Sequence, residues 1–348
     1  MKNRAIKIDK LVYGGKGAGF ANKMPVFIPM TVPGDEVEYK ITRQFKNYAE
    51  GSLIKILKPS PNRILPKCPY FGRCGGCQWQ HIGYAAQILW KQLIVEEQLR
   101  RIGKIFEPNV LPTIPSPNIW NYRNRVRLHK DKDGRVGFYA AGSHEIIEID
   151  ECLISLCHPR ENKEGFTQIN TFQNKNLQNL VADLVKTSGA NTVLELYCGN
   201  GNLTFAIAKN AREITAADSD KRAINNACHS CESRNPVHSM DPRFRGDDTN
   251  ITFICQSAQA AAKHFAKNKN VDCVVLDPPR DGCKDIIEDL LRLKPASIIY
   301  VSCNPSTLAR DIAMLIKGGY FLKQAQPIDM FPQTYHIETI AFLNRGQV

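Results

Sequence analysis

The sequence predicts an α/β protein in which a doubly wound parallel-sheet domain follows a small N-terminal β-barrel and a small β-rich central domain. From about residue 166, short apolar runs alternate with helical segments, as in a Rossmann-like parallel sheet. Before residue 60, short apolar runs alternate with turns, as in a small OB-like barrel. We therefore expect the barrel at residues 1–58, the central domain at 62–80 and 112–165, a helix within 81–111 that packs on the parallel-sheet domain, and that domain at 166–348.

The barrel is predicted from four apolar runs. The expected strands are Ile6–Leu11, Val26–Ile28, Val37–Ile41 and Gly51–Ile56. The glycines between 14 and 19 predict a turn. A phosphate-binding loop is excluded there, because Lys16 is followed by Gly17 instead of Ser or Thr, and a strand follows where a helix should begin.

The parallel-sheet domain is predicted from five further apolar runs and the helical segments near them. The expected strands are Thr192–Leu196, Glu213–Ala217, Ile251–Ile254, Asp272–Leu276 and Ile298–Val301. The expected helices are 203–209, 220–228, 257–266, 285–293 and 306–316. The stretch 229–248 is polar and has no apolar period, so it is predicted to be a surface insertion.

Positive charge is concentrated in the first 130 residues. The formal net charge is +12; residues 1–130 hold 22 Lys+Arg against 8 Asp+Glu, and residues 131–348 hold 24 against 26. A basic region joined to a near-neutral one predicts a polyanion-binding module next to a catalytic one. Arg123, Arg125 and Arg127 alternate along a predicted strand region, where they either contact phosphate or form a solvated face. The polar start and the absence of an apolar run near about 20 residues lead us to expect a cytoplasmic protein without a membrane partner.

The first strand of the parallel sheet leads into a glycine-containing loop. This loop, Tyr197 to Asn202, carries Gly199 and Gly201, which let the backbone approach a ligand at the carboxyl edge of the sheet. The third glycine of a dinucleotide fingerprint is missing, which weakens an NAD interpretation. Asp218 follows the next strand and is placed to accept hydrogen bonds from ribose hydroxyls. The combination favours S-adenosylmethionine, and an ordinary turn with a solvated aspartate is the alternative.

Two further loops should reach the same edge of the sheet. Asp277 and Arg280 follow the fourth strand and Cys303 follows the fifth, and the carboxyl ends of parallel strands meet at one edge. Glu338 begins a late strand that could reach this edge. Methylation of a pyrimidine at C5 needs a thiolate that adds to C6 and a base that removes the C5 proton. Taken alone, such a cysteine is more often a small buried hydrophobe, and such a glutamate is usually solvated.

The cysteines indicate a metal site. The chain has 12 cysteines without a secretory segment, so metal binding or catalysis should explain some of them. Cys68, Cys74 and Cys77 form a compact group, and Cys152 or Cys157 would supply a fourth ligand. Zinc and a [4Fe–4S] cluster both accept four cysteines. Three clustered cysteines and a distant one favour iron–sulfur, and the spacing differs from that of radical adenosylmethionine enzymes.

These motifs together resemble the RNA 5-methyluridine methyltransferase family, in its bacterial ribosomal-RNA branch. Ser302-Cys303-Asn304-Pro305 is similar to the family's nucleophile motif, and the stretch from Asp329 to Glu338 is similar to its base motif. The resemblance implies that Cys303 is the nucleophile and Glu338 the base. It also implies that the barrel is a TRAM domain, an RNA-binding module.

The resemblance implies the ligand-binding residues as well. The positions similar to the family's adenosylmethionine site are Gln168, Tyr197, Asn202, Asp218 and Asp277. Asp218 departs from the pattern, because the family usually has Glu there. The positions similar to the family's [4Fe–4S] ligands are Cys68, Cys74, Cys77 and Cys152.

The implied function is adenosylmethionine-dependent C5 methylation of a specific uridine in 23S ribosomal RNA by a monomer. A transfer-RNA uridine is an alternative substrate, and a catalytically inactive rRNA-binding assembly factor is the non-enzymatic alternative. Amino-group methylation of a base, which Asp277-Pro278-Pro279 is also similar to, needs no nucleophile and would survive Cys303→Ala. DNA cytosine-C5 enzymes place their cysteine after proline, whereas Pro305 follows Cys303 here, so no DNA partner is expected.

Overall fold

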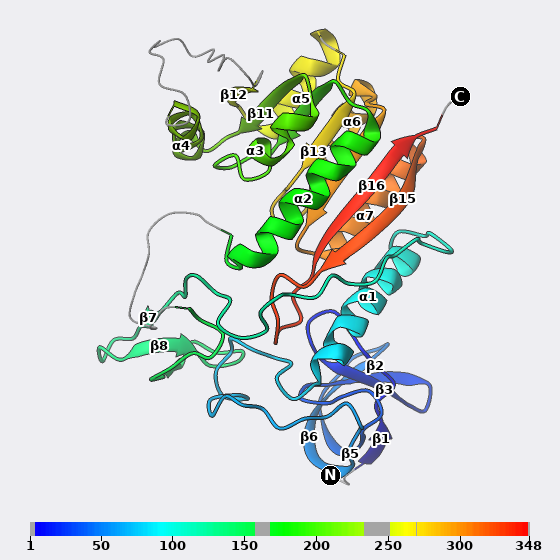
Figure 1. The fold of residues 1–348 in the computed structure, drawn as a ribbon. Helices are drawn as coiled ribbons and strands as arrows, with labels where there is room; N and C mark the ends of the chain where they lie inside the picture. Colours follow the sequence, from blue (N-terminus) through cyan, green and yellow to red (C-terminus); the bar gives the residue numbers. More distant parts are fainter. Residues whose placement is uncertain (1–3, 157–167, 233–250, 269, 347–348) are drawn as a thin grey trace. The chain divides into compact units, whose positions relative to one another are not determined.

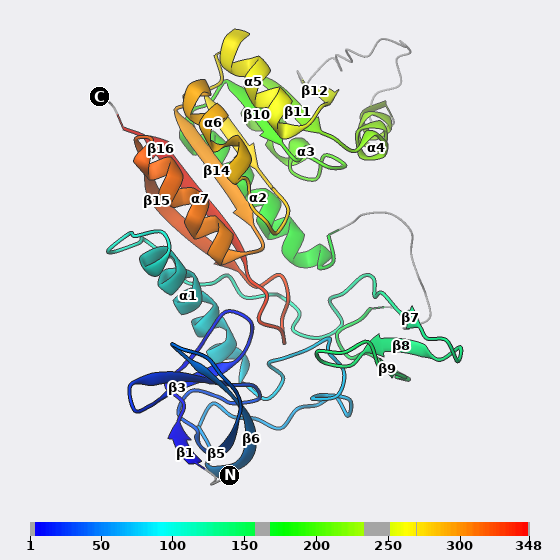
Figure 2. The same ribbon diagram turned by 180° about the vertical axis from the view of Figure 1, so that it is seen from behind.

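The computed structural model describes residues 4–156, 168–232, 251–268 and 270–346 (Figures 1 and 2). Two units share the chain. Unit 1 comprises Met1–Ile94, Pro112–Phe172 and Asp329–Ile337, and unit 2 comprises Val95–Leu111, Gln173–Ile328 and Glu338–Val348. Most of the expected insertion at 229–248 and the alternative ligand Cys157 lie outside the described residues.

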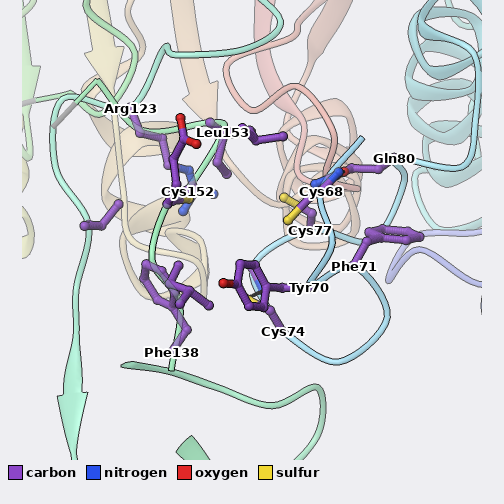
Figure 3. Close-up of a pocket in the computed structure, with 15 residues that line it drawn as sticks. Cys68, Tyr70, Phe71, Cys74, Cys77, Gln80, Arg123, Phe138, Cys152 and Leu153 are labelled. Atoms are coloured by element: carbon purple, nitrogen blue, oxygen red, sulfur yellow. Dashed lines mark hydrogen bonds between the residues drawn. The ribbon is translucent and has the colours of Figure 1, made fainter. Parts of the chain in front are cut away.

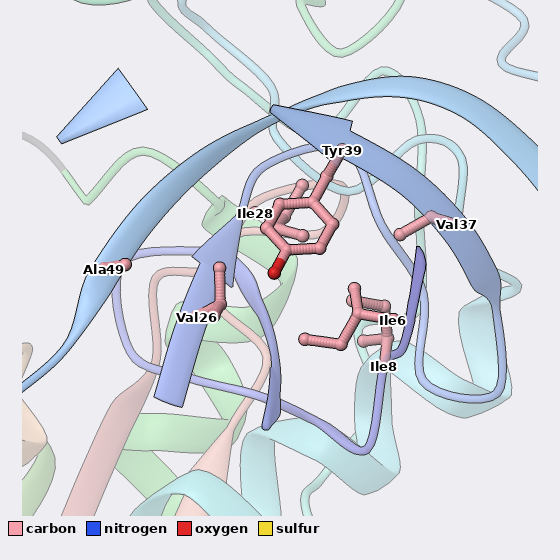
Figure 4. Close-up of a cluster of buried hydrophobic side chains, with 7 residues drawn as sticks. All are labelled: Ile6, Ile8, Val26, Ile28, Val37, Tyr39 and Ala49. Carbon is pink, nitrogen blue, oxygen red and sulfur yellow. The ribbon is translucent and has the colours of Figure 1, made fainter. Parts of the chain in front are cut away.

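Unit 1 contains a six-stranded sheet wrapped around its own core. The strands lie in the order β1-β5-β6-β4-β3-β2. Their bounds are β1 Arg4–Lys7, β2 Lys10–Leu11, β3 Gly17–Ala21, β4 Met24–Ile28, β5 Glu36–Gln44 and β6 Ala49–Lys58. Along β5, Val37 and Tyr39 are buried while Glu36 is exposed, which is the alternation expected of a sheet with one apolar face. The buried core is Ile6, Ile8, Val26, Ile28, Val37, Tyr39 and Ala49 (Figure 4).

Strand β3 was not predicted from the sequence, in which the glycines between 14 and 19 indicated a turn. The turn ends sooner, and Gly17 and Gly19 lie within β3. A Cβ on Gly17 would lie 2.2 Å from Thr31 Oγ1, and one on Gly19 would lie 2.2 Å from the Lys7 carbonyl oxygen. Neighbouring atoms pack directly against the backbone of β3 at these two positions and leave no room for a side chain. Glycine within a strand often marks such a close approach.

The rest of unit 1 holds a three-stranded sheet. Its strands are β7 His129–Lys130, β8 Val136–Tyr139 and β9 Ile146–Ile147, in that order. The expectation that Arg123, Arg125 and Arg127 alternate along a strand is wrong, because the chain before β7 forms only isolated bridges. Arg123 bridges both Ser155 and Asn170, so pairing with separate segments takes the place of a regular ladder.

Helix α1, Tyr84–Arg101, has its first residues in unit 1 and its last residues in unit 2. Within α1, Val95 and Leu99 are buried, whereas Leu89 is 52% exposed. Lys91 is fully buried. A charged side chain on the buried face of this helix requires a buried partner, and that partner is Asp329.

Unit 2 is built on a seven-stranded sheet in the order β12-β11-β10-β13-β14-β16-β15. Strands β10 to β14 are parallel, whereas β16 is antiparallel to both of its neighbours. The bounds are β10 Thr192–Leu196, β11 Glu213–Asp218, β12 Ile251–Cys255, β13 Cys273–Leu276, β14 Ser297–Ser302, β15 Tyr320–Ile328 and β16 Glu338–Arg345. All residues of β13 and β14 are buried, as expected for strands covered on both faces.

Helices cover both faces of this sheet, with α2 on one face and α6 and α7 on the other (Figures 1 and 2). The α-helices are α2 Thr171–Ser188, α3 Thr204–Ile207, α4 Lys221–Glu232, α5 Ala258–Asn268, α6 Ile287–Leu293 and α7 Pro305–Lys317. Short 3-10 turns, η1 and η2, occupy Ala208–Asn210 and Lys284–Ile286. The doubly wound parallel sheet predicted from the sequence is confirmed. Among the described residues, none of the helices combines the length and apolar character needed to cross a membrane.

Candidate active site

Cys303 lies in the loop between β14 and α7, and helix capping fixes this loop. Asn304 is the N-cap of α7, where its side-chain oxygen accepts a hydrogen bond from the Ser306 N–H at 3.1 Å. Pro305 occupies the first helical turn, where its missing N–H costs no hydrogen bond. Cys303 is therefore held directly ahead of a rigid helix start, at the carboxyl edge of the sheet.

The loop after β13 is tied to the Cys303 loop through the backbone of Arg280. The carbonyl oxygen of Arg280 accepts a hydrogen bond from Asn304 Nδ2 at 3.1 Å and from Thr307 Oγ1 at 3.0 Å. Asn304 was named in the sequence only as part of the nucleophile motif, and Thr307 was not singled out. An Asn before a proline at a helix start was the available signal for the cap, but the second contact depends on the neighbouring loop.

The surroundings of Cys303 act on its thiol in opposite directions. Burial raises the pKa of Cys303 to about 11, and the negative charges of Glu338 and Asp277 act in the same sense. Arg280 opposes them through its positive charge and a side-chain hydrogen bond to the thiol. The structure thus brings together the four chemical groups that the sequence placed at this edge of the sheet.

Glu338 reaches the site because β16 inserts beside β14. The two strands are antiparallel, with Ser302 opposite Thr339. Glu338, the first residue of β16, consequently lies at the end of β14 from which Cys303 follows. Glu338 is buried, and burial together with the charge of Asp277 raises its pKa well above the usual range, while Arg280 lowers it. Burial also raises the pKa of Asp277 to about 7.

The loop after β10 adopts the tight conformation that its glycines predict. Tyr197, Gly199 and Gly201 all have positive φ, at 65°, 54° and 79°. Glycine reaches this region without strain, whereas for Tyr197 it is uncommon and indicates a backbone held by its surroundings. The Gly199 N–H donates to Asp218 Oδ2 at 2.9 Å, and the Asp220 N–H donates to Asp218 Oδ1 at 2.8 Å. Asp218 therefore supports this loop in addition to any role toward a ribose.

Asn202 is engaged by helix α2. Its side-chain oxygen accepts from Asn174 Nδ2 at 2.8 Å and from Gln178 Nε2 at 3.0 Å. Its amide nitrogen donates to Asn174 Oδ1 at 3.0 Å. Gln168 belongs to unit 1, where its carbonyl oxygen accepts from Asn124 Nδ2 at 2.8 Å.

A further acid at this edge, Glu195 on β10, was not singled out in the sequence. It is buried, and burial raises its pKa to about 8, with the charges of Asp277 and Asp218 adding to the effect. Within the described residues its Oε2 atom has no hydrogen-bond partner. A glutamate inside an otherwise apolar parallel strand was the signal that could have found it.

The four cysteines of the expected metal site line one cavity of about 60 Å³ in unit 1 (Figure 3). Three of them come from the loop before α1 and Cys152 comes from a segment that also positions Arg123 in this cavity. In the part of the chain that the structure describes, no three His, Cys, Asp or Glu side chains form a group that could hold a metal ion as they stand. The number and type of donors are those of a four-thiolate site, although the described residues do not stand as a metal-binding group.

Lys91 is paired with Asp329 inside unit 1. Lys91 Nζ lies 2.5 Å from Asp329 Oδ1 and 3.0 Å from the Phe331 carbonyl oxygen, and both charged side chains are fully buried. The Tyr84 hydroxyl donates to Asp329 Oδ2 at 2.8 Å. This pair fixes the start of the segment 329–337, which leads along the chain into Glu338.

The fold and this edge of unit 2 define the class of the protein. A doubly wound sheet with a glycine loop and carboxylates at its carboxyl edge is a Rossmann-like architecture that binds a nucleotide-containing cofactor at that edge. A profile of the family described as tRNA (Uracil-5-)-methyltransferase matches residues 149–346. The chain is 33% identical to an uncharacterized RNA methyltransferase of Bdellovibrio bacteriovorus, over 97% of this chain and 94% of that protein. The chain therefore belongs to the tRNA (uracil-5-)-methyltransferase family, and it is an RNA (uracil-5-)-methyltransferase that uses S-adenosylmethionine.

Two other comparisons agree with this assignment. The chain is 32% identical to an uncharacterized RNA methyltransferase of Aquifex aeolicus, over 99% of each protein. It is also similar to the crystal structure of the Pyrococcus abyssi tRNA (uracil-54, C5)-methyltransferase in complex with S-adenosyl-L-homocysteine. That similarity has a TM-score of 0.69 and 25% identity, and it covers 98% of this chain and all of the other.

Proposed function

We propose that this chain methylates C5 of a specific uridine in 23S ribosomal RNA, with Cys303 as the nucleophile and Glu338 as the base. The observation that carries the proposal is the electrostatic neighbourhood of Cys303, in which Arg280, Glu338 and Asp277 all act on one thiol. A thiol, a cation and a buried carboxyl at one site are the groups that addition to a pyrimidine and later proton removal require.

The first step belongs to Cys303. Uracil C5 is a poor nucleophile until the Cys303 thiolate bonds to C6 and moves the electrons of the C5–C6 double bond toward C5 and O4. The charge of Arg280 favours this thiolate, whereas burial opposes it. When bound, S-adenosylmethionine would supply an electrophilic methyl group to C5, and its sulfonium sulfur would keep the electron pair of the broken C–S bond and leave as a neutral thioether.

The last step belongs to Glu338. Its carboxylate removes the proton from the methylated C5, the C–H electron pair restores the C5–C6 double bond, and the C6–S bond breaks to release the Cys303 thiolate. Burial makes this carboxyl more basic than an exposed glutamate, which suits proton removal, and Arg280 stabilises its charged form. The target base must leave its stack in the RNA to reach these residues.

The methyl donor would be held at the carboxyl edge of unit 2. Tyr197, Asn202, Asp218 and Asp277 are proposed to bind it, and Gln168 remains a residue assigned to the donor by the family resemblance alone. The positive φ of Tyr197 and the support of the Gly199 N–H by Asp218 favour a pre-formed binding loop. Because each oxygen of Asp218 already accepts one backbone hydrogen bond, a ribose contact would use its remaining lone pairs.

A [4Fe–4S] cluster is proposed at the cavity that Cys68, Cys74, Cys77 and Cys152 line. It would link the loop before α1 to the segment around Cys152, which are far apart in the sequence. Iron and sulfide analysis of anaerobically purified protein tests this proposal. Cys152→Ser should lose iron, while the matched variant Cys157→Ser should keep it. The opposite result, or zinc in place of iron, would show the ligand set or the metal to be wrong.

The six-stranded sheet is proposed to act as a TRAM domain that binds RNA. Residues 1–58 hold 11 Lys+Arg against 5 Asp+Glu, and this excess of positive charge supports contact with phosphates. Loss of these contacts should weaken RNA binding uniformly across sequences, because phosphates carry no sequence information.

The mechanism is tested with RNA that contains 5-fluorouridine. Fluorine at C5 cannot be removed as a proton is, so the reaction should stop at a covalent complex between Cys303 and the methylated base. Wild-type protein with methyl donor should form a denaturant-stable adduct, and Cys303→Ser should not. Cys255→Ser, which changes an exposed cysteine of the same unit, is the matched control and should behave as wild type. Absence of an adduct, or an equal yield with Cys303→Ser, would overturn the mechanism.

A transfer-RNA uridine is the second candidate substrate. It is favoured by the name of the matching family and by that of the Pyrococcus abyssi relative. Mapping of 5-methyluridine in ribosomal and transfer RNA from cells that lack the protein separates the two. Loss of a site in 23S ribosomal RNA supports the first proposal and loss of one in transfer RNA supports the second. No loss in either would favour an assembly factor without catalysis.

A further inference from the structure

Unit 1 contains an open groove of about 660 Å³ that the proposed chemistry does not use. The glycine turn before β3, His129 and the hairpin of Phe138 to Gly142 all line it. We propose that this groove binds an unpaired nucleotide of the RNA, with its base stacked on the ring pair of His129 and Tyr139. The inference rests on the proposed function, because it assigns a second contact to the same RNA.

The aromatic wall is the first observation that carries this inference. The rings of His129 and Tyr139 are stacked, with centroids 3.8 Å apart and planes 18° apart. Both residues line the groove and are only half-buried, so the stack is not enclosed in a core. Unpaired RNA bases are recognised by stacking on such side chains, histidine included.

Bare backbone on the groove walls is the second observation. Gly14 and Gly142 line the groove and have φ of 98° and 73°, and a Cβ on either would meet no atom within 4 Å. The positive φ explains why both are glycine, and the open space in front of them leaves room for a ligand to approach the backbone. A volume of about 660 Å³ is typical of a site for a small molecule or a nucleotide, and it is too small for a duplex.

The charge of the groove indicates stacking rather than phosphate attraction as the main source of affinity. Lys16 lines the groove, but its Nζ lies 2.5 Å from Glu50 Oε1 and is thereby neutralised in part. Loss of the ring stack should therefore lower the affinity without changing its dependence on salt. Loss of a lysine–phosphate contact would instead reduce the salt slope by about 1.

The hairpin wall is held by the loop that carries the cysteines. The Gly75 N–H donates to the Tyr139 carbonyl oxygen at 2.9 Å, and the Ala141 N–H donates to that of Arg73 at 3.1 Å. Cys74 and Cys77 line both the groove and the cysteine cavity. The position of the ring stack is consequently fixed by backbone pairing, which keeps the proposed platform in place before RNA binds.

The inference is tested by the affinity of the full chain for a fluorescent single-stranded oligouridylate, measured at several salt concentrations. His129→Ala and Tyr139→Ala should each weaken binding by about 5- to 150-fold, the factor expected for one lost base–aromatic stack, with an unchanged salt slope. Phe106→Ala is the matched control, because Phe106 is an 84% exposed aromatic side chain that does not line the groove. Wild-type affinity of the two groove variants, or equal weakening by Phe106→Ala, would overturn the assignment.

Photo-cross-linking of wild-type protein to a 5-iodouridine oligonucleotide does not depend on the folding of any variant. Cross-links within residues 14–16 or 129–142 support the groove, and cross-links found only elsewhere refute it. The 5-fluorouridine adduct is measured on the same samples. Adduct formation without groove binding would refute this inference alone, whereas groove binding without an adduct would refute the proposed mechanism.

Discussion

Replacing the buried carboxylate of Asp329 with an amide, in Asp329→Asn, is expected to destabilise unit 1 by about 3–5 kcal/mol, the usual cost of removing one partner of a buried ion pair. The side chains of Lys91 and Asp329 are both 0% exposed, and their charged atoms lie 2.5 Å apart. Burial lowers the pKa of Lys91, while the charge of Asp329 opposes this shift. The amide variant keeps the shape of the site and leaves the Lys91 ammonium without its counter-charge.

A double-mutant cycle separates the free energy of the Lys91–Asp329 ion pair from the cost of lost packing. Lys91→Met alone leaves the Asp329 carboxylate buried, with the Tyr84 hydroxyl still donating to it at 2.8 Å. The double variant Lys91→Met/Asp329→Asn buries no charge. Its cost should therefore be smaller than the sum of the single costs by about 0.5–3 kcal/mol.

Urea unfolding followed by tryptophan fluorescence measures these effects. The chain has three tryptophans, Trp79, Trp90 and Trp120, and all lie in unit 1, so the signal follows this unit. Lys91 Nζ lies 5.8 Å from the centroid of the Trp79 ring, which places the probe beside the perturbation. Asp133→Asn is the control, because that carboxylate is 80% exposed and its loss should leave the urea midpoint unchanged.

The reasoning is refuted if Asp329→Asn costs less than about 1 kcal/mol. It is equally refuted if the single costs simply add in the double variant. Either result would mean that water or a local rearrangement compensates the Lys91 charge once the carboxylate is lost.

Three further predictions concern charge. Burial alone would raise the pKa of Asp35, but Arg63 and two backbone N–H groups bring it below the usual range of an aspartate. Asp35→Asn should therefore lower the urea midpoint near neutral pH, and its difference from wild type should shrink as acid protonates Asp35. A difference that does not shrink in acid would contradict the linkage. The rate of Cys303 alkylation, measured by mass spectrometry, should rise about tenfold per pH unit toward the Cys303 pKa of about 11. Arg280→Met should slow this alkylation. A rate independent of pH would count against a buried thiol. Glu338→Gln should retain the addition step and lose proton removal. A covalent adduct should then accumulate even on ordinary uridine RNA, while product formation falls by at least about 10²-fold. Normal turnover would exclude Glu338 as the base.

Much of the candidate site followed from the order of elements in the chain. Cys303 and Asp277 were placed at one edge because each follows a buried strand of a parallel sheet, and such strands end together. The glycine loop at 197–202 was recognisable because positive φ leaves few alternatives to glycine. These features depend on local sequence and on a topology that the apolar periodicity already specifies.

Other features depend on pairing between segments that are distant in sequence. Arg123 was expected on a strand face, but bridges to Ser155 and Asn170 direct it to the cysteine cavity. Lys91 sits among apolar residues of α1 and its partner Asp329 is more than 200 residues away, so nothing in the helix itself signalled a buried ion pair.

The sequence alone determined the class of the sheet, the loops at its carboxyl edge and the concentration of positive charge near the N-terminus, because periodicity, glycine placement and charge counts are properties of short stretches. Only the tertiary structure decided that β16 enters antiparallel beside β14 and so places Glu338 next to Cys303. It also decided that bare glycine turns and stacked rings form one groove in unit 1. The physical reason is that burial and close approach are properties of the assembled core, to which each segment contributes only one side.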